Sequence, residues 1–160
     1  MPAINLAQLK TQTALLSEKF NQPEGFVLQL NVLLDFYTNR TIRSTQIARR
    51  LSLPTYRTPK PVLRQIQFEL ANQAEKQPAQ AIALANSLWR AGWLETRLLA
   101  AYLLGCIPPA QAIPSLTRLP EWLSLSTDKQ VRTALLPDAL SRLRTENLEA
   151  LLCYAVGWVT

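Results

Sequence analysis

Apolar side chains recur at three- and four-residue spacing in one short segment after another, and proline or glycine separates many of these segments. This spacing places the apolar side chains on one face of an α-helix. Only four of the 160 residues are glycine, and Leu, Ala, Gln and Arg are abundant, which favours helix over sheet. A chain of this length can bury the core of one domain. The sequence therefore predicts a single all-α domain.

The segments and the residues between them predict where each helix begins and ends. We expect helices over 4–20, 26–37, 45–51, 62–76, 78–91, 93–104, 109–119, 129–143 and 145–158. Gly92 and Gly105 are expected to end two of these helices, and Ser44 and Thr145 to cap two others. In the last helix we expect a buried face made of Leu148, Leu151, Leu152 and Ala155.

Short helices joined by short turns are typical of antiparallel helix pairs stacked side by side, and no strict sequence repeat is visible. We therefore predict a divergent α-solenoid. Residues 1–40 would form an N-terminal helix pair, 41–61 a basic connection containing prolines, and 62–160 the stacked helices. Because the apolar run after Leu148 has no polar tail, we expect either that the natural chain continues past Thr160 or that a terminal helix docks into the core.

Charge is distributed unevenly along the chain. Between Phe36 and Phe68 there is no carboxylate, and the basic side chains there are Arg40, Arg43, Arg49, Arg50, Arg57, Lys60 and Arg64. The other ten of the seventeen basic side chains share the rest of the chain with all eleven acidic ones, so the net charge of +6 arises in this segment. Such a block attracts polyanions, of which nucleic acid is the commonest. A solvated basic face or an arginine-rich linker is the alternative interpretation.

Several kinds of chemistry are excluded or disfavoured by composition. The chain has no histidine, which excludes Ser-His-Asp and Cys-His catalysis and histidine-ligated zinc. Cys106 and Cys153 lie far apart in apolar surroundings and are expected to be buried thiols. Carboxylates are scattered, and no glycine-rich phosphate loop is present. We expect no cofactor, no metal site and no membrane partner, and a cytoplasmic location.

Two segments carry a resemblance to a known family. Glu95 lies in the first turn of an expected helix and Arg97 follows two residues later, before a run of Leu and Ala. Because these two side chains cannot share a face, Arg97 must point to a neighbouring helix or a ligand. Upstream, residues 54–64 form a proline-rich basic stretch before a helix. Over residues 54–158 the chain resembles the DNA alkylation repair family, which consists of HEAT-like helical-repeat DNA glycosylases.

The resemblance implies a HEAT-like α-solenoid whose concave basic surface grips double-stranded DNA by its backbone. Under this hypothesis the phosphate contacts are made by Arg57, Lys60, Arg64, Arg90, Arg97 and Arg132. Members of the family recognise cationic alkylated bases with aromatic faces and a nearby carboxylate, which needs no histidine. The candidate carboxylate here is Asp128, and the candidate stacking residues are Trp122 and Trp158. We expect Trp89 and Trp93 to pack between helices and Trp122 to be exposed.

This chain departs from the family at one position that matters for catalysis. The family pattern has two acidic residues after the Glu-x-Arg helix and its successor, and here the second position is Val131. The missing acid calls glycosylase activity into question and leaves DNA binding open.

Two other functions fit parts of the sequence. A non-catalytic HEAT-like scaffold would bind an acidic protein partner through the same basic surface. Alternatively, residues 44–53 resemble the first helix of a helix-turn-helix regulator. A recognition helix should then follow within three or four residues, but Pro54, Pro59 and Pro61 prevent a continuous helix before about residue 61.

Overall fold

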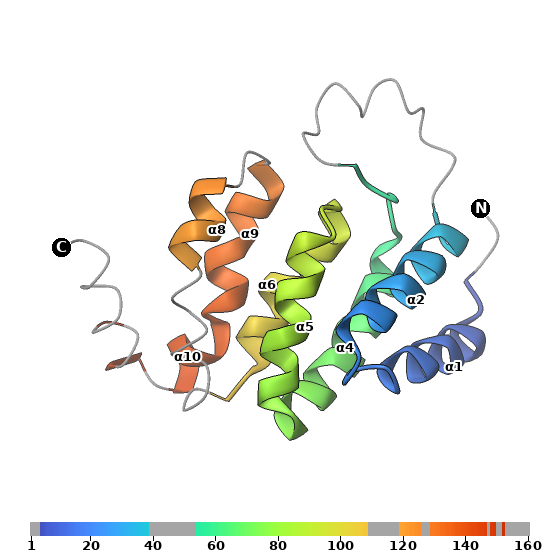
Figure 1. The fold of residues 1–160 in the computed structure, drawn as a ribbon, viewed down its shortest axis with the longest axis horizontal. Coiled ribbons are helices and arrows are strands. Elements are labelled where there is room, and N and C mark those ends of the chain that lie inside the picture. Colours follow the sequence, from blue (N-terminus) through green and yellow to red (C-terminus); the bar gives the residue numbers. More distant parts are fainter. Residues whose placement is uncertain are drawn as a thin grey trace.

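The computed structural model describes residues 4–38, 54–108, 119–125, 129–146, 148–149 and 152, and within them every regular element is a helix (Figure 1). The helices are α1 (Leu6–Ser17), α2 (Pro23–Phe36), α4 (Lys60–Lys76), α5 (Pro78–Arg90), α6 (Leu94–Cys106), α8 (Leu119–Leu125), α9 (Lys129–Ala139) and α10 (Ser141–Glu146). The all-α prediction is confirmed for this part of the chain. The expected helix over 45–51 lies outside the described residues, as do Ser44 and residues 109–118 of the helix expected over 109–119. Leu119, expected to end that helix, begins α8.

The helices stack in two rows. In the first row α1 contacts α4, α4 contacts α6, and α6 contacts α9. In the second row α2 packs on α1 and α5, while α5 packs on α4 and α6. Helix α8 lies against α9, and α10 contacts both α6 and α9. Stacking of neighbouring helices, as predicted, is therefore the basis of this fold.

Helix α6 lies in the middle of the stack because it is apolar on almost every side. Its fully buried side chains include Leu99, Leu103 and Leu104. A helix that is apolar all round must be covered on all sides, and α4, α5 and α9 provide that cover. Helix α4, in contrast, shows the expected single stripe, which is buried at Val62, Ile66, Leu70 and Ala74.

The two glycines expected to end helices differ in role. Gly92 has a φ of 79°, a left-handed conformation that glycine adopts without a steric penalty, and it follows the end of α5 as predicted. Gly105 does not end a helix, because α6 continues through it to Cys106. A Cβ at Gly105 would lie 1.9 Å from the carbonyl oxygen of Asp138, so glycine is needed here for the close approach of α6 and α9.

The C-terminal predictions are partly wrong. The helix expected over 129–143 is divided into α9 and α10, and Thr145 lies inside α10 instead of capping a new helix. The Thr145 hydroxyl donates to the carbonyl oxygen of Ser141 at 3.2 Å, one turn earlier in the same helix. Leu148 and Leu152 were expected in a buried face, but they are 53% and 57% exposed.

Candidate nucleic-acid interface

Residues 54–59, the last part of the basic connection, form an extended segment that lies against the start of α6. The Leu94 amide donates a hydrogen bond to the carbonyl oxygen of Pro54 at 2.9 Å. The Tyr56 ring stacks on the Trp93 ring, with centroids 4.1 Å apart and planes inclined by 17°. The prolines thus produce the extended chain predicted from the sequence, and α6 holds it in place.

Glu95 makes the main polar contacts between this segment and α6. Its side chain is only 3% exposed, and burial of a carboxylate is costly unless hydrogen bonds replace water. Three donors supply those bonds: the Thr55 hydroxyl at 2.5 Å, the Tyr56 amide at 3.2 Å and the Thr58 amide at 3.4 Å. The first-turn position of Glu95 was predicted, but these contacts with the extended segment were missed.

The backbone between the donors is turned at Arg57. This residue has a φ of 52°, in the left-handed region that costs a non-glycine residue about 1–2 kcal/mol. Its amide donates to the Thr55 hydroxyl oxygen at 3.0 Å. Such a turn directs neighbouring amides toward one anion, here the Glu95 carboxylate. Burial raises the pKa of Tyr56, and the negative charges of Asp35 and Glu95 raise it further.

The side chains expected to contact phosphate lie at the ends of several helices. Lys60 and Arg64 lie in the first two turns of α4, and both are exposed. Arg90 is the exposed last residue of α5. Arg97 is half-buried near the start of α6, and Arg132 is exposed near the start of α9.

These helix ends lie at the same end of the stack. The bonds to Glu95 join the segment before α4 to the start of α6, and the close approach of Gly105 to Asp138 joins the far ends of α6 and α9. At about 1.5 Å per residue, Arg97 lies about 12 Å along α6 from Gly105, and Arg132 lies about 9 Å along α9 from Asp138. We call the set Arg57, Lys60, Arg64, Arg90, Arg97 and Arg132 the basic end.

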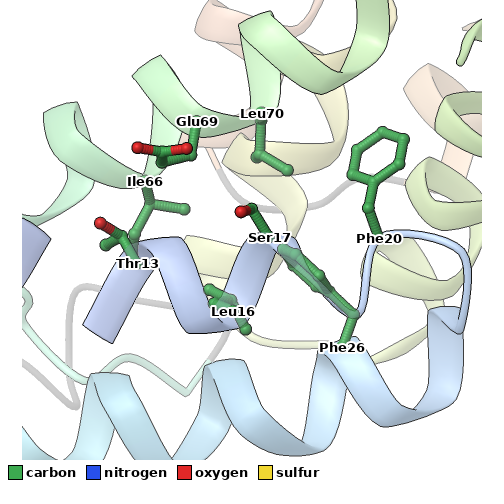
Figure 2. A pocket seen from close by; sticks show the side chains of 8 residues that line it. All are labelled: Thr13, Leu16, Ser17, Phe20, Phe26, Ile66, Glu69 and Leu70. Atoms are coloured by element: carbon green, nitrogen blue, oxygen red, sulfur yellow. The ribbon is translucent and has the colours of Figure 1, made fainter. Parts of the chain in front are cut away.

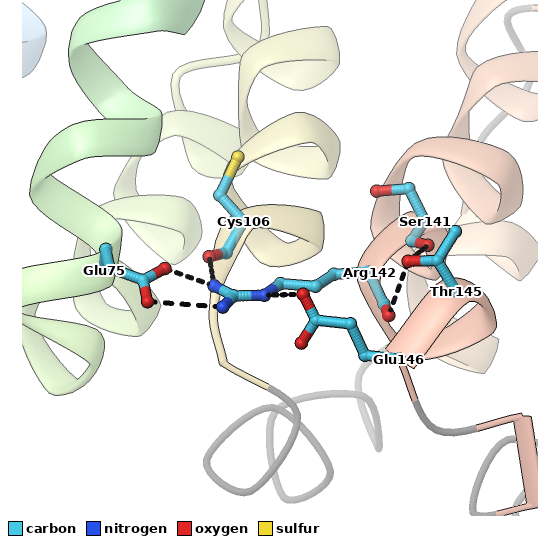
Figure 3. A network of polar contacts seen from close by, with 6 residues as sticks. All are labelled: Glu75, Cys106, Ser141, Arg142, Thr145 and Glu146. Atoms are coloured by element: carbon cyan, nitrogen blue, oxygen red, sulfur yellow. Dashed lines mark hydrogen bonds and ion pairs between the residues drawn. The ribbon is translucent and has the colours of Figure 1, made fainter.

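At the opposite end of the stack, by contrast, positive and negative side chains pair with each other (Figure 3). The Arg142 guanidinium binds Glu75 of α4 through both terminal nitrogens, one at 3.2 Å, and donates to Glu146 at 2.8 Å. It also donates to the carbonyl oxygen of Cys106 at 3.0 Å. The hydrogen bond from Arg142 lowers the pKa of the Glu75 carboxyl below its usual value. At this end, one arginine is therefore paired with two carboxylates.

Trp89 packs between helices as predicted, whereas Trp122 and Trp93 depart from the predictions. Trp122 was expected to be exposed, but only 5% of it is accessible, and its ring stacks on Trp89 with centroids 4.3 Å apart and planes within 2°. The Arg97 guanidinium lies 4.7 Å from the centroid of the Trp89 ring, and its Nε donates to the Trp89 carbonyl oxygen at 3.4 Å. Arg97 thus points to a neighbouring helix, as predicted, while Trp93 packs mainly on Tyr56.

Two predicted site residues and several others lie outside the part of the chain that the structure describes. Asp128, Trp158, Cys153 and the four arginines from Arg40 to Arg50 lie outside the described residues. Val131 is 1% exposed within the core, so the position that the family pattern makes acidic holds a packed apolar side chain. Cys106 is half-buried, and burial raises the pKa of its thiol.

A narrow crevice between α1, α2 and α4 has no features of a binding site (Figure 2). It is lined by Thr13, Leu16, Ser17, Phe20, Phe26, Ile66, Glu69 and Leu70. Two of its polar groups are already used, because the Thr13 and Ser17 hydroxyls donate to carbonyl oxygens of α1.

In the described part of the chain, no group of acidic or sulfur ligands is placed to hold a metal ion. Among the same residues, no helix is both long and apolar enough to cross a membrane.

Compared with known proteins, the chain matches no family model, no curated protein and no solved structure.

Proposed function

We propose that this chain is a DNA-binding protein, built as a HEAT-like α-solenoid, that grips the backbone of double-stranded DNA with its basic end. One observation carries the proposal: six basic residues from five segments, namely the extended segment, α4, α5, α6 and α9, lie at one end of the helix stack, where α4, α6 and α9 begin. Glu95, which lies closest to the extended segment, is buried and bonded within the protein, so it offers little competition to an external anion. Glu24, in contrast, lines a hollow together with Arg90. Two rows of stacked helices support the solenoid part of the proposal.

The arrangement suits phosphate recognition. Lysine and arginine side chains that neutralise phosphates release condensed counterions, and this release supplies much of the affinity of backbone binding. The starts of α4, α6 and α9 add partial positive charge from the helix dipoles at the same end. Contacts of this kind orient a protein on the duplex and carry no base sequence information. The proposed binding is therefore salt-dependent and independent of sequence.

No catalytic step is part of the proposal. Val131 fills the second acidic position with a core side chain, and the Trp122 ring is stacked within the fold. Recognition of a damaged base stays a hypothesis that rests on the family resemblance. Binding to duplexes with and without a central abasic or alkylated site tests it, and equal affinities would contradict it.

The interface is tested by two triple variants that remove the same charge from different places. Arg57→Ala/Lys60→Ala/Arg64→Ala removes three charges from the basic end. Lys19→Ala/Lys76→Ala/Arg144→Ala removes three charges elsewhere and is the matched control. Fluorescence anisotropy with a short random duplex should show a loss of about tenfold or more for the first variant, and a much smaller loss for the control. Equal losses would mean that net charge alone matters, which contradicts a defined interface.

The alternative, a scaffold for an acidic protein partner, has one observation in its favour. The outer side of α2 exposes Leu28, Val32 and Phe36 at four-residue spacing, each more than 60% accessible. Exposed apolar surface of this kind is typical of protein interaction sites. Absence of duplex binding at low salt, together with binding to an acidic polypeptide that the first triple variant loses, would favour the scaffold over the DNA-binding protein.

A further inference from the structure

We infer that Glu95 is the positioning residue of the basic end, because its carboxylate holds residues 54–59 in the conformation that presents Arg57 and Lys60 to DNA. The inference rests on the proposed function and adds to it the element on which the shape of the interface depends. Glu95 itself touches no DNA, since only 3% of it is accessible.

Glu95 provides three of the hydrogen bonds that hold this segment. Residues 54–59 belong to no helix or strand. The Leu94 amide binds the Pro54 carbonyl oxygen at one end of the segment, and amides of the first turn of α4 bind the Pro59 carbonyl oxygen at the other. Between these ends, the Tyr56 ring stacks on Trp93. The Glu95 carboxylate, in contrast, binds three groups distributed over 55–58. It is the point on which the polar contacts of the segment converge.

The direction of Arg57 follows from these bonds. Its neighbours on both sides, Tyr56 and Thr58, donate their amides to the same carboxylate. The left-handed backbone of Arg57 lies between those two anchored amides. Left-handed conformations of non-glycine residues persist only where the surroundings impose them. Without Glu95 we expect the turn to open, and the Arg57 and Lys60 side chains to lose their fixed placement.

Pre-organisation of residues 54–59 should strengthen the affinity for DNA. A binding segment that is already ordered loses less conformational entropy when it binds than a loose one. Glu95→Gln replaces a charge-assisted acceptor by a neutral amide, and we expect DNA binding about tenfold weaker. The direction of the change in DNA affinity is diagnostic. The substitution also removes a negative charge, and by electrostatics alone it would strengthen binding to DNA. Glu121→Gln, at an exposed position of α8, makes the same change of charge and is the matched control.

A second pair of variants keeps the charge of Glu95. Thr55→Val removes the hydroxyl that donates to Glu95 and accepts from the Arg57 amide, and it should weaken binding in the same direction. Thr55→Ser retains the hydroxyl and should bind like the natural protein. If Glu95→Gln fails to fold, which circular dichroism reveals, the comparison of Thr55→Val with Thr55→Ser carries the test.

Limited trypsin digestion without DNA reports the position of the segment directly. Arg57 precedes threonine and is open to cleavage once the segment detaches, whereas Lys60 precedes proline and resists trypsin. We expect faster cleavage after Arg57 in Glu95→Gln and Thr55→Val than in Glu121→Gln and Thr55→Ser. Unchanged cleavage would overturn the inference, and so would fast cleavage with DNA affinity equal to that of the control. If the natural protein binds no DNA, the proposed function fails, while the cleavage rates still decide whether Glu95 anchors the segment.

Discussion

Replacement of Gly105 by alanine tests the closest contact in the helix stack. The new Cβ would lie 1.9 Å from the Asp138 carbonyl oxygen and 2.8 Å from the Ser141 hydroxyl oxygen. Ordinary contacts begin at 3.4 Å, so α6 and α9 would have to separate by about 1.5 Å. Because a backbone atom is the main obstacle, rotation of a side chain cannot relieve the clash.

The expected change in the free energy of unfolding follows from two opposing effects. Overpacking of a core costs about 1–3 kcal/mol, and the upper part of that range applies to a backbone obstacle. Alanine in place of glycine within a helix gains about 1 kcal/mol. We therefore expect a loss of about 2 kcal/mol, which lowers Tm by about 4–8 °C in a chain of this size. Thermal unfolding followed by circular dichroism measures this shift.

Gly25→Ala is the matched control. It makes the same substitution inside α2, where the nearest atom to the new Cβ is a Gln22 side-chain oxygen at an ordinary 3.5 Å. This variant should keep Tm unchanged or raise it, because alanine in a helix adds up to about 1 kcal/mol to the free energy of unfolding. A Gly105→Ala protein as stable as the Gly25→Ala protein would refute the close approach of α6 and α9.

Two further predictions concern the tryptophan stack and the opposite end of the molecule. Trp122→Ala removes a buried ring that stacks on Trp89, and it should lower the free energy of unfolding in urea by about 3–5 kcal/mol. A fully stable Trp122→Ala protein that no longer binds DNA would instead support a base-stacking role. The lowered pKa of Glu75 means that its pairing with Arg142 stabilises the fold above about pH 4.5 and that this contribution is lost as pH falls through the lowered value. The Tm of Glu75→Gln should therefore fall less than that of the natural protein as the pH is lowered. Parallel curves of Tm against pH would contradict this.

Helix positions could be predicted because they depend on local spacing. The helix expected over 62–76 was found as Lys60–Lys76, with Val62, Ile66, Leu70 and Ala74 buried as the period requires. The extended connection before it was also predicted, since proline restricts its own backbone and that of the preceding residue. These features need no knowledge of distant parts of the chain.

Features that depend on distant contacts were missed. Gly105 looked like a helix end, because a glycine that ends a helix and one that admits a neighbouring backbone look the same in one sequence. Trp122, next to a proline, looked exposed, but its partner Trp89 comes from another helix. The partners of Glu95 lie 37 to 40 residues away. No local spacing connects Glu95 with a segment so far away, so the sequence carried no signal for that contact.

The salt dependence of duplex binding tests the central claim most directly. If the six side chains of the basic end all contact phosphate, the logarithm of the association constant should fall against the logarithm of salt concentration with a slope of about −5. Arg57→Ala/Lys60→Ala/Arg64→Ala should reduce the magnitude of that slope by about 3, and Lys19→Ala/Lys76→Ala/Arg144→Ala should leave it nearly unchanged. A slope near zero for the natural protein, or the same slope for both variants, would contradict a DNA interface at the basic end.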